Sequence, residues 1–222
     1  LDISKLLDEW EYTGPDKLIV RKITGNNGQI LIQMRVGLGI LQMEWSDRPD
    51  GKRPHGKSSL LVHYQEQLKK QAAEHCPDTQ LNLTQADCMN LQSESLQYYY
   101  RRICMFELDA YHEASRDAEH NLQIMDMIRA HAENENDRLS FEQYRPFVIM
   151  HRTRARSLLA MGDDNIDDAI HHIQEGIEEI ETFFRSYDRN DLLKDSQELK
   201  ILRDMAEELL KQQPLSEEDL LK

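Results

Sequence analysis

The spacing of hydrophobic residues changes near residue 57 of this 222-residue chain. Before that point, residues 17–23 and 29–36 are rich in β-branched residues and flank the turn sequence Gly25-Asn26-Asn27-Gly28. Asn-Gly supplies the positive φ values of a tight turn, so this stretch predicts an antiparallel hairpin. Residues 37–39 contain two glycines that bend or break the second strand, and residues 40–45 can continue it. We therefore expect two or three antiparallel strands.

After residue 57, apolar residues recur every three or four positions, which predicts amphipathic helices. The expected helices span about 58–75, 84–108, 111–132, 146–162, 166–184 and 191–212. Ser140 offers a capping box for the fourth helix, but Pro146 favours a start near residue 146. The last helix is expected to cover the exposed face of the preceding hairpin. The two longest apolar stripes are Tyr111, Ala114, Ala118, Leu122, Met125, Ile128 and Ala132, and Ile166, Ala169, Ile170, Ile173, Ile177, Ile180 and Phe184.

The turn regions of two predicted helical hairpins can be aligned. Leu108 to Ala114 corresponds to Met161 to Ala169, so that a helix end, a tight turn and a small residue in the next helix match. This pattern resembles the turn of a tetratricopeptide repeat. Ala114 and Ala169 are 55 residues apart, whereas the period of that family is about 34 residues. We attribute the excess to longer helices and to an insertion at residues 163–165.

The resemblance covers residues 90–186 and implies a stack of antiparallel helices. In such repeats the first helix of each hairpin lines a concave surface. Arg101 and Arg102 stand where the family has Leu and Gly, while Ala155 matches the family in the second unit. The layout of the whole chain, including the loop from Arg48 to Gly56, is also similar to that of uncharacterised bacterial proteins carrying a UvrB/UvrC (UVR) motif, a short helical hairpin that docks on partner proteins. That motif is not within these residues, so no residue role follows from it.

The predicted fold class is α+β and mainly α. A small N-terminal antiparallel β-hairpin region is followed by a stack of long antiparallel helices resembling tetratricopeptide repeats. The predicted parts are residues 1–57 with a Gly/Pro-rich loop, a helical domain at 58–213, and a tail at 214–222 that begins another amphipathic helix. No apolar run is long enough to span a bilayer.

Charge and cysteine content narrow the function. Basic and acidic residues balance within residues 1–80, so the net charge of −14 falls on the helical part. That part is not expected to bind nucleic acid or an anionic membrane. The three cysteines form no CxxC pair, which argues against a disulfide-stapled secreted fold and favours a reducing cytoplasm.

Residues 51–58 match the phosphate-binding pattern GxxxxGK[ST], with Gly51, Gly56, Lys57 and Ser58 at the defining positions. Such a site needs backbone amides aimed at the phosphates, a Lys for the phosphate oxygens and a hydroxyl for Mg²⁺. Pro54 removes one amide, and the downstream helices do not supply the parallel strands of nucleotide-binding folds. We favour a Gly/Pro-shaped connector here and keep a nucleotide-binding enzyme or switch as an alternative.

Asp-x-x-His pairs begin at Asp109, Asp117 and Asp168 and put two metal-ligand types on one helix face. A di-metal bundle uses Glu-x-x-His from two helices and further Glu residues in the core. Asp117, His120 and Asp168 lie off the apolar stripes, so we expect them to face water. We predict no metal and no cofactor, and the hydrolase signatures GxSxG and HExxH do not occur.

Arginines concentrate on the helices that the repeat resemblance places on the concave surface, whereas acids concentrate on the following helices. This segregation predicts a cationic groove for a peptide with carboxylates, with aromatic residues adding contact area. The alternative is that the arginines pair with neighbouring acids and the tyrosines serve packing. The predicted groove residues are Arg101, Arg102, Arg152, Arg156, Tyr99 and Phe106, with Arg154 on the same helix as two of them.

The sequence therefore predicts a non-catalytic, cytoplasmic adaptor or scaffold that binds a protein or peptide, and the arginines favour an acidic one. Nucleotide binding by residues 51–58 is one alternative. The other is a structural protein whose apolar stripes bury against a second copy of the chain, so self-association stays open.

Overall fold

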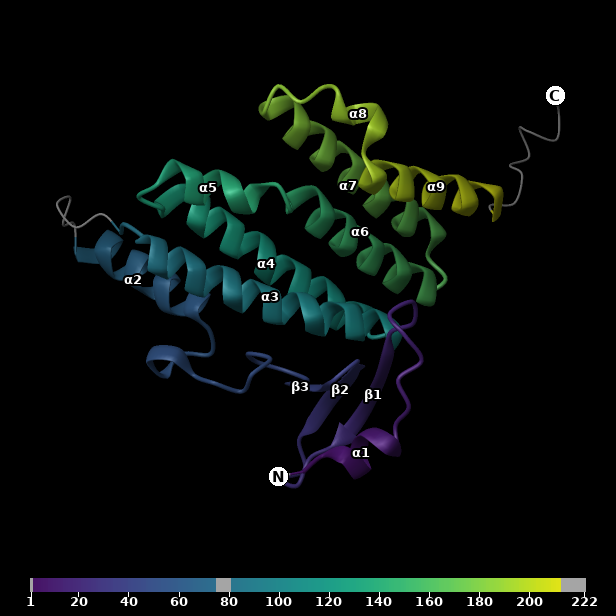
Figure 1. Cartoon of the computed structure of the whole chain (residues 1–222). Coiled ribbons are helices and arrows are strands. Elements are labelled where there is room, and N and C mark those ends of the chain that lie inside the picture. Colours follow the sequence, from purple (N-terminus) through teal and green to yellow (C-terminus); the bar gives the residue numbers. More distant parts are fainter. Residues whose placement is uncertain (1, 75–80, 213–222) are drawn as a thin grey trace.

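The computed structural model describes residues 2–74 and 81–212 and has the predicted α+β, mainly helical fold. A small sheet lies against the lower side of a helical stack (Figure 1). In the described residues, no helix combines the length and the apolar character needed to cross a bilayer. The predicted tail at 214–222 lies outside the described residues. The elements are α1 (Ser4–Asp8), β1 (Ile19–Thr24), β2 (Ile30–Val36), β3 (Gly39–Glu44), the 3-10 helix η1 (Pro54–Gly56), α2 (Leu60–Glu74), α3 (Gln85–Glu107), α4 (Tyr111–His131), α5 (Glu135–Glu142), α6 (Arg145–Gly162), α7 (Ile166–Ser186), α8 (Leu192–Asp195) and α9 (Gln197–Gln212).

The strands form one three-stranded antiparallel sheet in the order β1-β2-β3. Of the two or three strands predicted, three are present in the described residues. Thr24 pairs with Ile30, which leaves residues 25–29 as the loop between β1 and β2. Gly28 has a φ of 80°, whereas Asn27 does not take a positive φ. The Asn-Gly sequence therefore marks the correct place for the turn, but the connection is a longer loop in which Gly28 supplies the left-handed residue.

One face of the sheet packs on α3. Ile32, Met34 and Met43 are buried in a cluster with Cys104 and Met105 of α3. The sheet and the helices therefore share a hydrophobic core. The predicted boundary after residue 57 falls between η1 and α2, in the connector that joins these two regions of secondary structure.

The hairpins α3/α4 and α6/α7 have matching turns. Ala114 and Ala169 are both fully buried, each as the fourth residue of its helix, α4 or α7. Asp109 and Asp164 occupy equivalent places in the two turns, with φ values of 53° and 58°. In both turns the amide of the next residue donates a 2.9 Å hydrogen bond to the carbonyl five residues earlier, as helices ending in a left-handed residue do.

The insertion expected at residues 163–165 is wrong, because residues 109–114 correspond to residues 164–169 without a gap. The extra length beyond a short repeat lies in the long helices and in α5. Within the second hairpin, α6 and α7 approach closely at Gly176. A Cβ atom at that position would lie 2.1 Å from Thr153 Oγ1, so the packing requires glycine.

The polar segment between the two hairpins forms α5, a helix that the sequence patterns did not predict. Asn134 caps this helix by accepting a 2.9 Å hydrogen bond from the amide of Asn136, and acidic residues fill the first turn. Ser140 therefore lies inside α5 and caps nothing. Helix α6 begins at Arg145, one residue before Pro146, so the start predicted near residue 146 is confirmed.

The helix expected at 191–212 is split at Ser196 into α8 and α9. The Ser196 hydroxyl accepts a 3.2 Å hydrogen bond from the amide of Leu199 and so caps α9. Leu199 and Leu202 are buried in one cluster with Ile173 and Phe184 of α7. The last helix therefore covers the second hairpin, as predicted.

Candidate binding site

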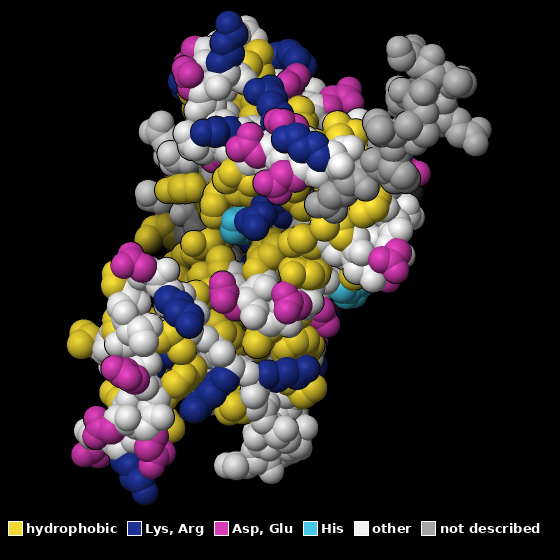
Figure 2. All heavy atoms as spheres, turned by 90° about the vertical axis from the view of Figure 1, so that its right-hand side faces the viewer, with side chains coloured by type: hydrophobic (Ala, Val, Ile, Leu, Met, Phe, Trp, Pro, Cys, Tyr) yellow, Lys and Arg dark blue, Asp and Glu magenta, His cyan; other side chains and the backbone are white. Residues whose placement is uncertain are grey.

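Matching stripes of α3, α6 and α9 form one face of the molecule, which we call the first-helix face. The Tyr99 and Phe147 rings are 6.0 Å apart and the Phe106 and His151 rings 5.4 Å apart, so α3 and α6 meet along these stripes. Figure 2 views the molecule from the side where α3 and α6 end. Hydrophobic side chains (yellow) there surround a histidine (cyan) and a basic side chain (dark blue). The face consists of Gln92, Ser95, Tyr99, Arg102 and Phe106 of α3, Phe147, His151, Arg154, Leu158 and Met161 of α6, and Glu198, Ile201, Met205 and Glu208 of α9.

Two hollows lie on the first-helix face. The larger hollow, of about 820 Å³, is partly open and is lined by residues of α3, α4, α5 and α6 and by Glu198 of α9. The smaller hollow, of about 390 Å³, lies between α6 and α9 and contains Arg154 and Leu158. Both volumes fall in the range of sites that hold small ligands or side chains of a partner.

Arg102 lies in the lining of the larger hollow and is 0% exposed. Its Nε donates a 3.2 Å hydrogen bond to Nδ1 of His151. Its Nη1 and Nη2 atoms are buried and have no hydrogen-bond partner among the described residues. Burial lowers the pKa of Arg102 to about 10, so the side chain is still a cation at neutral pH. The Tyr99 ring lies 5.6 Å from the guanidinium carbon.

A buried cation without an acceptor is costly, because it has lost its hydration and gained no partner.

No protein-family model, curated protein or solved structure matches this chain. The interpretation of the face therefore rests on its own contacts, and the likeness to tetratricopeptide repeats stays a prediction. Buried polar groups are normally hydrogen-bonded, so the unpaired nitrogens of Arg102 call for an explanation.

His151 is held as a neutral imidazole beside Arg102. Because Nδ1 accepts the hydrogen bond from Arg102, the ring proton resides on Nε2. Burial and, after it, the positive charges of Arg102 and Arg154 lower the pKa of His151 to about 3. Its ring lies 4.3 Å from that of Phe147. His151 therefore contributes no charge to the larger hollow at neutral pH.

The placement of Arg101 in the groove is wrong. Arg101 is fully buried on the side of α3 that faces α4 and the loop after β3. Its Nε and Nη2 donate bonds of 2.7 and 2.8 Å to the carboxylate of Asp117, and Nη1 donates to the carbonyls of Glu44 and Asp47 at 3.0 and 2.8 Å. Arg101 is thus a fully paired core residue. Asp117, expected to face water, is 0% exposed for the same reason.

Arg152 and Arg156 also lie away from the first-helix face. Arg152 forms ion pairs with Glu119 of α4 and Glu179 of α7. Arg156 lies 3.5 Å from the same Glu119 carboxylate. For these residues and for Arg101 the alternative prediction, pairing with acids between the helices, is confirmed.

Three predicted groove residues, Tyr99, Arg102 and Phe106, do lie together on the first-helix face. The structure adds His151 and Phe147, which the sequence patterns did not single out. Their spacing of four residues, continued at Arg154 and Leu158 by steps of three and four, was the available signal.

The loop that matches the phosphate-binding pattern does not form a phosphate cradle. Residues 45–50 separate it from β3, and the sheet is antiparallel. The amides of Gly51, Gly56 and Lys57 donate to carbonyls of the loop at 2.9, 3.1 and 2.9 Å, and Lys57 forms an ion pair with Glu66. Ser58 precedes α2, whose first amides are also occupied. This geometry favours the connector interpretation of Gly51 to Ser58.

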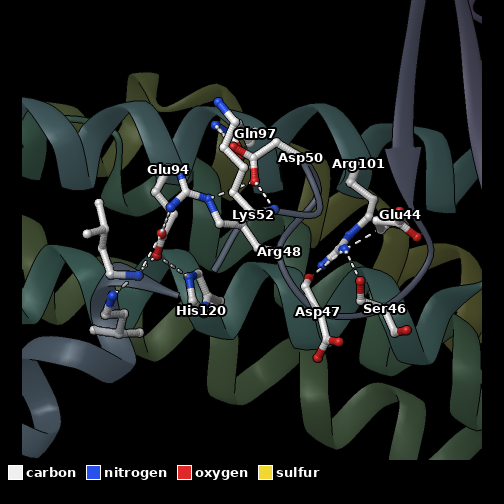
Figure 3. A network of polar contacts seen from close by, with 12 residues as sticks. Glu44, Ser46, Asp47, Arg48, Asp50, Lys52, Glu94, Gln97, Arg101 and His120 are labelled. Carbon is white, nitrogen blue, oxygen red and sulfur yellow. Dashed lines mark hydrogen bonds and ion pairs between the residues drawn. The ribbon is translucent and has the colours of Figure 1, made fainter. Parts of the chain in front are cut away.

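Glu94 organises the connector. Its buried carboxylate accepts bonds from the amides of Leu60 and Leu61 at 2.8 and 3.3 Å and pairs with Arg48 at 3.2 Å and His120 at 3.1 Å. Figure 3 shows this cluster beside the bonds from Arg101 to the same loop. The N-terminus of α2, where a nucleotide-binding loop would hold phosphate, thus holds an internal carboxylate.

The Asp-x-x-His pairs are used in other ways. His120 pairs with Glu94 and its ring stacks 3.7 Å from that of Tyr98. The Asp109 carboxylate accepts a 2.6 Å bond from the hydroxyl of Tyr111. Over residues 2–74 and 81–212, no group of three or more His, Cys, Asp or Glu side chains is placed to hold a metal ion.

The buried neutral state of His151 predicts a pH-dependent stability. The folded pKa of about 3 lies below the value of about 6.5 for an exposed histidine, so the unfolded chain binds one more proton between these values. Stability is therefore fully present above pH 6.5 and falls on acidification. We expect the titration of His151 to lower the free energy of unfolding by about 1.4 kcal/mol between pH 7.5 and pH 5.5, as measured by urea unfolding. The variant His151→Gln should lose this part of the pH dependence, whereas the control His112→Gln, at an exposed position, should keep it. Equal pH dependence in wild type and His151→Gln would contradict a buried, neutral His151.

Proposed function

We propose that this protein is a non-catalytic adaptor whose first-helix face binds an apolar peptide or protein segment that carries a carboxylate. The supporting observation is Arg154. It lies half-buried in the smaller hollow, 5.4 Å from the Phe106 ring, and forms no ion pair with any acid of the described residues. Asp204 and Glu208 line the same hollow, but neither lies within ion-pair distance of Arg154, so a partner's carboxylate would supply the missing ion pair.

Exposed apolar side chains border the two hollows. Leu96 and Tyr144 beside the larger hollow are 50% and 54% exposed, and Ile201 beside the smaller one is 39% exposed. Apolar surface of this kind marks interaction sites. From Phe147 to Met161 the α6 stripe is about 21 Å long, at about 1.5 Å per residue. An extended segment of about six residues spans that length.

The titratable groups of the region support a binding role over a catalytic one. At neutral pH Arg102 is charged and His151 is neutral, so neither exchanges a proton readily. Burial raises the pKa of Cys104 to about 12 and that of Cys88 to about 11, which keeps both thiols protonated and unreactive. Both thiols are free, which suits the reducing cytoplasm, where we place the protein.

Arg154→Glu tests the adaptor proposal. Peptides selected from a random display library against the whole chain should share an acidic residue flanked by apolar ones. Calorimetry with such a peptide should show at least tenfold weaker binding to Arg154→Glu, because a carboxylate would then face a carboxylate. The control Lys69→Glu makes the same charge change at an exposed position of α2 and should bind like wild type.

Selected peptides without a carboxylate, or unchanged affinity of Arg154→Glu, would contradict the proposal.

The alternatives have separate tests. Self-association would bury the same apolar side chains, so light scattering at several dilutions should then show a mass above 26.1 kDa. Binding of ATP or GTP that is lost in Lys57→Ala would revive the nucleotide alternative.

A further inference from the structure

The larger hollow contains an uncompensated charge at its floor. Arg102 keeps two unpaired terminal nitrogens, and the neighbouring acid Asp117 is already bound on both oxygens by Arg101. Glu198 also lines the hollow, but its carboxylate accepts a bond from the hydroxyl of Ser196 and forms no ion pair with Arg102. Within the described part of the chain, nothing balances this guanidinium at short range.

The walls of the larger hollow are mostly apolar. Arg102 is accompanied by one other buried group without a partner, the Oδ1 atom of Asn121. Rotation of that amide would present its NH₂ group to an anion beside Arg102. The apolar lining consists of Leu96, Tyr99, Met125, Phe141, Phe147 and Val148. A partly open hollow of about 820 Å³, with mainly apolar surface and a few polar groups, has the character of a small-molecule site.

We infer that the larger hollow binds a small organic acid, with its carboxylate on the two Nη atoms of Arg102 and its aromatic or aliphatic body against the apolar walls. The parallel N–H groups of a guanidinium match the two oxygens of a carboxylate. This site goes beyond peptide binding, because it lies at the floor of the larger hollow, whereas the peptide proposal rests on Arg154.

The charge balance favours a monoanion. Arg102 contributes one positive charge and His151 none, so a carboxylate is neutralised in full. A phosphate dianion would leave one negative charge in a mainly apolar hollow, where Glu198 of the lining adds repulsion. Arg154 lines the smaller hollow and not the larger one.

Entry of the acid requires a local side-chain movement. The Nη atoms of Arg102 have no exposed surface, although the residue lies in the lining of the hollow. Tyr99 is half-buried beside the guanidinium, and its rotation would open a path to it.

The test compares 4-phenylbutyrate and octanoate with their primary amides on the wild-type chain. The acids should raise the thermal midpoint and bind in calorimetry, and the amides, which lack the charge, should bind at least tenfold more weakly. Equal effects of acid and amide, or no effect of either acid at millimolar concentration, would overturn the inference without any variant being needed.

Two variants locate the site. Arg102→Met removes the unpaired charge, so its thermal midpoint should be at or above that of wild type while acid binding falls at least tenfold. Leu96→Asp, at an exposed border position, should weaken acid binding severalfold by repulsion. Lys69→Met is the matched control and should bind like wild type. Unchanged acid binding in both Arg102→Met and Leu96→Asp would overturn the assignment to this hollow, whatever the outcome of the peptide experiments.

Discussion

Replacing Asp117 by Ala is expected to lower the free energy of unfolding by about 3–5 kcal/mol, as removal of one partner of a buried ion pair does. Asp117 accepts two bonds from Arg101, at 2.7 and 2.8 Å, and both side chains are excluded from water. Without the carboxylate, Arg101 and its neighbour Arg102 would both be buried cations lacking an acid. Urea unfolding monitored by circular dichroism measures the loss.

A double replacement separates the ion pair from the packing around it. In Asp117→Leu with Arg101→Met no buried charge is left unpaired, so much of the stability should return relative to Asp117→Ala. Glu107→Ala, at an exposed position of α3, should stay within about 0.5 kcal/mol of wild type. A loss below about 1 kcal/mol in Asp117→Ala would show that the pair is not a main support of the core.

The architecture was largely predictable because its signals are local. Apolar spacing located α3, α4, α6 and α7, and glycines marked the ends of the strands. The equivalence of Ala114 and Ala169 holds because a left-handed turn and a small buried residue recur together. The helix α5 was missed because its sequence is polar, so its capping by Asn134, and not a stripe, is its signal.

The site was predictable only in part, because pairing is a tertiary property. Successive residues of a helix point about 100° apart, so Arg101 and Arg102 serve different sides of α3. The sequence does not show which of them meets an acid. Asp117 is a carboxylate off the apolar stripe, a position that normally faces water. Its burial follows from Arg101 and the loop carbonyls, which are far away along the chain.

The contrast between these neighbouring arginines connects stability with function. Arg101 holds the sheet loop to the helices through its bonds to Asp117, Glu44 and Asp47. Arg102 is equally buried but lacks such partners on its terminal nitrogens. A group that costs stability and adds no contact is expected where binding needs it. The proposed acid site would supply the missing partner, and mass action would then stabilise the loaded protein.

Glu94→Ala is expected to destabilise the protein by about 3–5 kcal/mol, because one buried carboxylate holds four partners: two amides, Arg48 and His120. Its loss would leave Arg48 with Asp50 as its remaining ion-pair partner and the first amides of α2, those of Leu60 and Leu61, without acceptors. The effect should be strongest at the connector, so hydrogen exchange should speed up at these two amides more than in α7. Urea unfolding gives the global loss, and Glu107→Ala serves again as control.

Protonation of the Glu94 carboxylate is expected to lower the stability of the protein at acid pH. Burial alone would raise the pKa of Glu94, but the bonds from His120 and from the amides of Leu60 and Leu61 outweigh it and leave the pKa below 4.5. The folded pKa is depressed, so this stabilisation is present above pH 4.5 and is lost as the pH falls through the folded value. Glu94→Gln should lack this acid step and should cost less than Glu94→Ala at neutral pH, because the amide still accepts hydrogen bonds. If Glu94→Ala left exchange at Leu60 and Leu61 unchanged, the carboxylate would not be what holds the connector to α3.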